Sequence, residues 1–432
     1  MTMPAATTTP SPSPSRIPSD RMETRRRLAT AATYVLVLVL LLISGAVLRA
    51  VNIPYASSTG PIFAKIHPAT YLAVIAVLMW GWASGGLGRL IGRVAITHPG
   101  AVMFGTGIVL LLFQTAVIVK LPLAPIIDTF LLPLLLFVCL IRLDAANRER
   151  MTILAHVLVI INALLGVFEY ASGWRLTPML EADGTVIAYD WRASALFGHP
   201  LSNAFITGNY IVALAFGAAP RLHPAFRILL MGIAGVAMIA FGGRVAMVLA
   251  IAMIGLASGL GAIRMLIGHR FHLNHAVLAT LLVTVGALFA VVFVESGGAD
   301  RFIARFSEDH GSAQTRLSML YIFGDLTREQ FLMWPDADII WQAQREHSIR
   351  IGVESSEVGF VANYGLLVTL AFFTTLAAFM RELVTLTSRQ TWWSVLYFVG
   401  VMSSSLGIAA KTTVLAMYVF FTLTLMPRDT ET

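Results

Sequence analysis

The chain has 432 residues, of which 57% are hydrophobic and 12% are charged, and its mean hydropathy is +0.79. A water-soluble domain of this length has no core large enough to bury so much apolar surface, so the composition excludes a soluble globular protein. The net charge of +7 is explained by arginines that set membrane topology and requires no nucleic acid as a partner. The composition therefore predicts an integral membrane protein.

Residues 1–30 begin with a tract rich in Pro, Ser and Thr that has nothing to bury, which predicts a disordered cytoplasmic N-terminus. Arg25, Arg26 and Arg27 then precede a long apolar stretch. A cleaved signal peptide has the same order of charged and apolar residues, but this apolar stretch is too long for one. We therefore expect a first membrane helix here.

Apolar runs that can cross about 30 Å of hydrocarbon, or nearly so, recur along the chain. They predict an all-α polytopic membrane protein with about 12 transmembrane helices and one large loop between spans 9 and 10. Spans 1–9 fall in residues 31–294, the loop in 295–357, spans 10–12 in 358–426, and a tail in 427–432. The runs are residues 31–48, 71–87, 102–119, 123–140, 153–170, 201–218, 228–241, 245–262, 276–294, 358–380, 393–408 and 413–425.

Arginines in the short loops predict the orientation, because basic loops are retained in the cytoplasm. They follow every second span, so both termini are expected to be cytoplasmic and the large loop to lie outside. These arginines are Arg89, Arg93, Arg142, Arg148, Arg150, Arg221, Arg227, Arg264, Arg270, Arg381 and Arg389.

Two outer segments carry arginines at the membrane surface. Residues 191–201 read Trp-Arg-Ala-Ser-Ala-Leu-Phe-Gly-His-Pro-Leu and enter span 6, which places Arg192 and His199 near the outer face. Gly-Gly-Arg at 242–244 is so short a turn that Arg244 must lie between two helices, where a guanidinium is costly unless it meets an anion or carbonyl groups. Arg192, Arg244 and Arg316 of the large loop could therefore form a clamp for phosphate oxygens. The alternative is that the outer arginines are solvated and paired with acidic loop residues.

The sequence predicts no metal site and no cofactor. Cys139 is the single cysteine, and the ten histidines lack the spacing of a metal-binding helix. Neither a Walker loop nor a dinucleotide fingerprint is present.

These motifs, in this order and with a large loop after span 9, resemble the O-antigen ligase and Wzy-type polysaccharide polymerase superfamily. Within it, residues 153–380 are most similar to the polymerase-like proteins of bacterial exopolysaccharide gene clusters. The resemblance implies a metal-independent glycosyltransferase of the bacterial inner membrane that acts on undecaprenyl-diphosphate-linked oligosaccharides at the periplasmic face. It implies that Arg192 and Arg244 bind the diphosphate with help from Arg316, in Thr-Arg-Leu-Ser at 315–318; we assign His199 to the same site.

The resemblance also locates a catalytic base, with one departure. The family tends to carry a histidine about three helical turns before a glycine of the next span, and counting back from Gly365 gives Glu354. A carboxylate can accept the proton of an attacking sugar hydroxyl as an imidazole does. We therefore expect Glu354 or Glu357 to be the base, with His347 as the nearest histidine. Alternatively, the two carboxylates are interfacial residues paired with Arg350.

The large loop contains a helical pattern of its own. Ala313, Leu317, Leu320 and Tyr321 recur at helical spacing before Gly324, which predicts an amphipathic helix that lies on the outer leaflet or packs on the bundle.

Two alternative functions remain. A ligase would transfer the glycan to a final acceptor, but the departure at Glu354 from the usual histidine favours a polymerase. The expected partners of a polymerase are membrane lipid and a chain-length co-polymerase and flippase of the same pathway. A transporter such as a flippase also has about twelve spans, and Asp128 and Glu169 are the intramembrane carboxylates that proton coupling would use. The loop after span 9, rather than between spans 6 and 7, disfavours this alternative.

Overall fold

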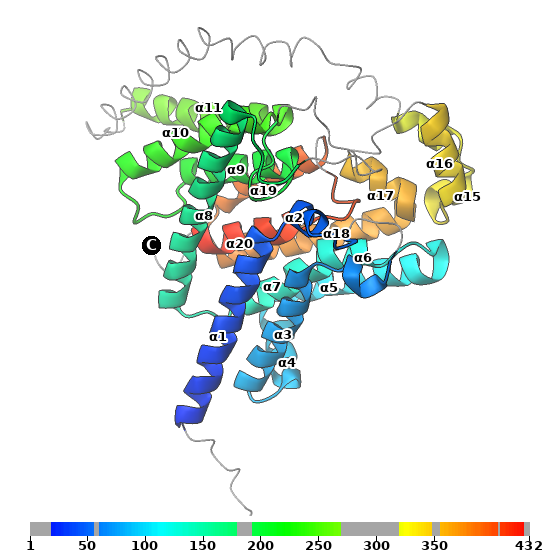
Figure 1. The fold of residues 1–432 in the computed structure, drawn as a ribbon, viewed down its shortest axis with the longest axis horizontal. Coiled ribbons are helices and arrows are strands. Elements are labelled where there is room, and N and C mark those ends of the chain that lie inside the picture. Colours follow the sequence, from blue (N-terminus) through cyan, green and yellow to red (C-terminus); the bar gives the residue numbers. More distant parts are fainter. Residues whose placement is uncertain are drawn as a thin grey trace, which may run out of the picture.

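The computed structural model describes residues 19–55, 60–178, 192–268, 319–347, 355–404 and 407–426, and these residues form helices without a β-strand (Figure 1). Helices cover most of each apolar run that is described. The predicted ninth span, residues 276–294, lies outside the described residues. The main helices are α1 (Ser19–Leu42), α3 (Pro68–Ala83), α5 (Pro99–Phe113), α7 (Leu132–Leu140), α8 (Ala145–Ser172), α9 (Pro200–Ala215), α10 (Pro224–Phe241), α11 (Arg244–Leu266), α18 (Leu366–Leu386), α19 (Thr391–Met402) and α20 (Val414–Leu425).

Four helical segments within the described ranges are long and apolar enough to cross a membrane: Pro99–Val119, Ala145–Ser172, Pro224–Phe241 and Leu366–Leu386. A fifth results if α3 and α4 (Leu87–Thr97), which are bent by 96° relative to each other, count as one span. Other predicted spans correspond to shorter apolar helices, such as Thr391–Met402 and Val414–Leu425. The described chain is thus a helical protein with four or five helices able to span a bilayer.

The core of the bundle is built around α9 and α20. Every residue of α20 is buried, as is nearly all of α9. The two helices pack against each other and against α8, and Figure 1 shows α20 near the centre of the bundle. Short helices of this kind need not match the bilayer thickness, because protein rather than lipid surrounds them.

Three predicted boundaries are corrected by the structure. α1 begins at Ser19, so residues 19–30 of the segment predicted to be disordered are helical, and Glu23 and Arg27 pair one turn apart there.

The other two corrections concern later runs. The run at 358–380 is not one helix but two, α17 (Ser356–Tyr364) and α18, separated at Gly365 with φ 82°. A Cβ on Gly365 would lie 2.8 Å from the carbonyl oxygen of Leu332, so the close approach of α15 (Arg328–Leu332) requires glycine. The predicted loop after span 2 is largely the helix α4, whose Leu90 is buried while Arg89 and Arg93 are exposed.

Contacts between loops define one end of the bundle, which we call the Arg192 end. The Lys411 ammonium donates to the carbonyl oxygen of Tyr55 at 2.8 Å. His67 Nε2 is 2.7 Å from the carbonyl oxygen of Ile43, one residue before Ser44, and a side chain on Gly198 of the 191–201 motif would overlap Ser44. These contacts join loops that are far apart in the sequence.

The opposite end, which we call the Arg142 end, is held by different polar contacts. Arg142 donates to Ser84 Oγ at 3.2 Å, and Arg221 pairs with Glu149 at 3.1 Å. His98 Nδ1 lies 2.9 Å from a carboxylate oxygen of Glu382, which joins the start of α5 to the end of α18. Arg142 and Arg221 of the short loops therefore lie away from Arg192.

Lysine labelling tests which end faces outward. The chain has three lysines, Lys65, Lys120 and Lys411, and Lys120 is exposed. If the Arg192 end faces the periplasm, a membrane-impermeant amine reagent should modify Lys120 in intact spheroplasts, and Lys120→Arg should remove that modification. Peptide mass spectrometry locates the label. Labelling of Lys120 only after lysis would mean the opposite orientation.

Candidate functional site

Glu169 anchors the loop that carries Arg192 to α8. Its buried carboxylate accepts hydrogen bonds from the backbone N–H groups of Leu176 at 2.8 Å, Ser194 at 2.8 Å and Ala195 at 2.9 Å. A carboxylate that accepts three N–H bonds stabilises a fixed loop conformation, because releasing it would leave a buried charge without partners. Glu169 is therefore occupied in holding the loop, which the sequence alone did not indicate.

Two asparagines complete the support of this loop. Asn162 Oδ1 accepts from the N–H of Leu196 at 3.0 Å, and Asn203 Nδ2 donates to the carbonyl oxygens of Ser194 at 2.6 Å and His199 at 2.9 Å. Both amides are buried. The backbone from 193 to 199 is thus fixed by side chains of α8 and α9.

The structure brings the segments of Arg192 and Arg244 together. The N–H of Ala193 donates to the carbonyl oxygen of Ala240 at 3.0 Å, four residues before Arg244, the first residue of α11. Gly243 packs directly on Ala204 of α9, where a Cβ would not fit. Both arginines are half-buried. The backbone segments that carry Arg192 and Arg244 therefore lie next to each other at one end of the bundle.

His199 lies at the same end, at the N-terminus of α9. Its side chain is exposed, and its Nδ1 accepts the N–H of Leu201 at 3.2 Å. A ring nitrogen that accepts a hydrogen bond carries no proton, so this contact places the ring proton on Nε2. The N-terminus of a buried helix also favours anions. His199 is thus placed at a helix N-terminus in the same motif as Arg192.

Glu357 reaches the Arg192 end through α19. It is exposed in the first turn of α17, and its carboxylate accepts hydrogen bonds from Ser403 and, at 3.0 Å, from Ser355. Ser403 directly follows α19, whose Tyr397 donates to the carbonyl oxygen of Ala246, two residues after Arg244. The Glu357 carboxylate and the first turn of α11, which begins with Arg244, are thus both linked to the second half of α19.

His347 lies apart from this group. It ends α16 (Ala337–Glu346) and its Nε2 is 3.0 Å from Asp325 Oδ2, with its ring against Tyr321. Arg316 and Glu354 lie outside the described residues. The end of the predicted loop helix is described: Leu320 and Tyr321 are exposed, Met319 and Ile322 are buried, and the turn ends at Gly324 as predicted.

A buried ion pair that the sequence did not reveal lies at the same end. Asp128, fully buried in a π-helical turn at Ile127–Leu131, accepts from the N–H of His67 at 3.0 Å and from Thr70 Oγ1 at 2.7 Å. Lys411 Nζ lies 3.5 Å from Asp128 and 3.3 Å from the centre of the Tyr55 ring. Burial lowers the pKa of the Lys411 ammonium to about 8, although the Asp128 charge opposes this shift. Through the hydrogen bond from His67, the pair links the chain before α3 to the loop before α20.

Within the described ranges, no group of three His, Cys, Asp or Glu side chains could hold a metal ion. No protein-family model matches the chain, and neither a curated protein nor a solved structure matches it.

Proposed function

We propose that this protein polymerises undecaprenyl-diphosphate-linked oligosaccharide repeats at the outer face of a bacterial inner membrane. The observation that carries the proposal is the hydrogen bond from Ala193 to Ala240, which holds the turns of Arg192 and Arg244 side by side. Two guanidinium groups at a membrane surface match a lipid diphosphate, because each can bind two phosphate oxygens.

In the proposed reaction, a hydroxyl of the new lipid-linked repeat attacks the anomeric carbon of the growing chain. The carbon–oxygen bond to the diphosphate breaks as the new glycosidic bond forms, and undecaprenyl diphosphate leaves. Arg192, His199 and Arg244, with Arg316, stabilise the charge that builds on the leaving group. Glu354 accepts the hydroxyl proton; Glu357 and His347 are the alternative bases, and the contact of His347 with Asp325 favours the carboxylates.

The two carboxylates that proton-coupled transport would use are engaged in other contacts. Glu169 accepts three backbone N–H groups, and Asp128 is paired with Lys411. Both carboxylates thus serve to hold loops in place, rather than facing a path for a transported ion. This arrangement supports the glycosyltransferase over a transporter.

Lipid-linked sugars in a deletion strain test the proposal. We expect single repeats on undecaprenyl diphosphate to accumulate on the periplasmic face, detected by mass spectrometry with a test of membrane face. The control is the same strain with the gene restored. Long chains left on the lipid would identify a ligase instead, and single repeats trapped on the cytoplasmic face would identify a flippase.

A further inference from the structure

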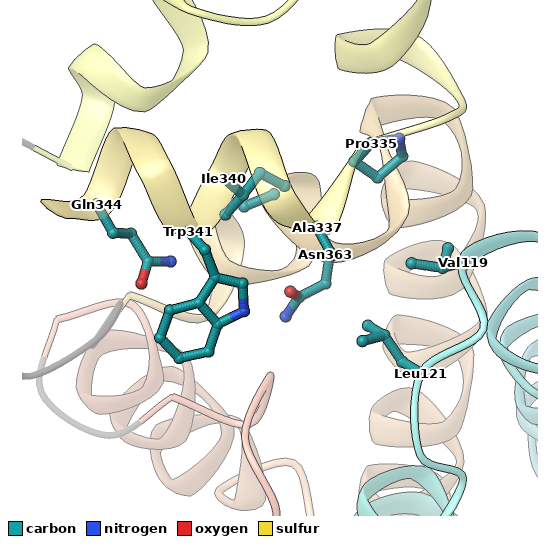
Figure 2. Close-up of a pocket in the computed structure, with 9 residues that line it drawn as sticks. Val119, Leu121, Pro335, Ala337, Ile340, Trp341, Gln344 and Asn363 are labelled. Carbon is teal, nitrogen blue, oxygen red and sulfur yellow. The ribbon is translucent and has the colours of Figure 1, made fainter. Parts of the chain in front are cut away.

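A cavity of about 100 Å³ lies between the large loop and the bundle. Its walls come from α16, from α17 and from the chain that follows α5, including Val119 and Leu121. A single water needs roughly 15 Å³ by the same measure, so the space admits a larger ligand. Figure 2 shows the Trp341 indole with the Gln344 and Asn363 amides around this space.

The polar groups of the cavity are unpaired within the part of the chain that the structure describes. Within the described chain, no hydrogen bond is made by the amides of Gln344 and Asn363 or by the indole N–H of Trp341. Trp341 is 63% exposed, so one side of its ring remains open. An amide both donates and accepts hydrogen bonds. The cavity therefore offers paired donors and acceptors beside an aromatic face, and none of its lining residues is charged.

The cavity is held in a fixed position. Met319, Ile322, Ile340 and Ala343 of the large loop form an apolar cluster with Ala362 of α17, beside Asn363. Gln114 Nε2 donates to the carbonyl oxygen of Met333 at 3.0 Å, which fixes the chain before α16 to the end of α5. Two independent contacts thus seat α16 on the bundle.

We propose that this cavity binds a neutral sugar residue of the acceptor glycan, an inference that rests on the proposed function. A pyranose ring has an apolar face that packs on an indole and a rim of hydroxyl groups that suits amides. The uncharged lining does not suit a diphosphate, which Arg192 and Arg244 would bind. Asn363 is six residues beyond Glu357 on α17, which places the cavity about 9 Å along the helix axis from the first turn.

Binding to the purified full chain in nanodiscs tests this site. The probe is the set of neutral oligosaccharides released by mild acid from the polymer of the producing strain, followed by saturation-transfer NMR. We expect Trp341→Ala and Asn363→Leu each to weaken binding about tenfold, the equivalent of about 1.4 kcal/mol. Trp392→Ala, which removes an exposed tryptophan from α19 near the Arg142 end, is the matched control and should bind as the wild type does.

The two substitutions also separate sugar binding from membrane anchoring. An interfacial tryptophan can anchor a helix in the headgroup region, but an asparagine amide has no such role. Normal binding by Asn363→Leu would therefore overturn the proposal, whatever Trp341→Ala does.

Assays in cells distinguish failure of the sugar site from failure of the proposed function. If Arg192→Ala abolishes polymer while both cavity variants bind and polymerise normally, the sugar site is wrong and the polymerase stands. If the deletion strain accumulates no single repeats on undecaprenyl diphosphate while the cavity variants lose binding, the sugar site stands and polymerisation is wrong.

Discussion

Alanine at Arg192 or at Arg244 is expected to reduce polymer at least about 100-fold while leaving the amount of protein unchanged. Loss of one preorganised group that stabilises developing charge costs a factor of this order. Lysine at either position should restore only part of the activity, because an ammonium cannot bind two phosphate oxygens in the plane of a guanidinium. Polymer length and amount are measured by gel electrophoresis of cell extracts, and protein by immunoblot.

Arg389→Ala is the matched control, because Arg389 is exposed between α18 and α19, near the Arg142 end. It should leave polymer unchanged. Normal polymer from both Arg192→Ala and Arg244→Ala would rule out the clamp, and equal activity of the lysine variants would rule out bidentate binding.

Methionine in place of Lys411 is expected to destabilise the protein by about 3–5 kcal/mol, because it leaves the buried Asp128 carboxylate without its counter-charge. The double variant Asp128→Asn/Lys411→Met should recover much of that loss. Lys120→Met, which removes an exposed lysine, should change stability by no more than about 0.5 kcal/mol. Cys139 reports unfolding, since it is the single cysteine and fully buried, so a fluorogenic maleimide reacts with it only after the bundle opens.

The pH dependence of stability, measured by the same maleimide labelling of Cys139, tests the pKa of Lys411. Its folded pKa of about 8 lies below its ordinary value of 10.5, so the unfolded chain binds more protons between these values. Stability from this group therefore rises with pH from about 8 to 10.5. The wild type should gain stability relative to Lys411→Met across that window. A constant difference between the two proteins would contradict the shifted pKa.

The apolar runs predicted where helices form, but they did not predict where a helix is interrupted. The run at 123–140 coincides with the helical segment Ala124–Leu140, because its ends are marked by Pro and by Arg142. The run at 358–380 gives no sign of the interruption at Gly365. The interruption accompanies the close approach of Leu332, which comes from a distant part of the chain. Likewise, a hydropathy window treats α4 as a loop because its apolar residues cover only one face.

Some residues of the candidate site could likewise be predicted from the sequence, whereas others could not. Arg192, His199 and Arg244 could be singled out from their short motifs, and the structure places their segments at one end. The roles of Glu169 and Lys411 depend on hydrogen bonds across 25 residues or more, which no local pattern encodes. Trp341, Gln344 and Asn363 became visible only as walls of a common cavity. Side chains whose role is set by distant backbone cannot be identified from spacing alone.

The bend between α3 and α4 has a consequence for the surrounding lipid. α3 runs from His67, beside the Asp128–Lys411 pair, to α4 and has 16 residues, which gives it a length of about 24 Å. A typical hydrocarbon core is about 30 Å thick, so this helix is matched either by local thinning of the bilayer or by flanking side chains that extend to the headgroups. α4, with Arg89 and Arg93 exposed, is suited to lie in the headgroup region and fix that depth. We therefore expect bilayer thickness to set how deeply the Arg192 end sits relative to the lipid headgroups.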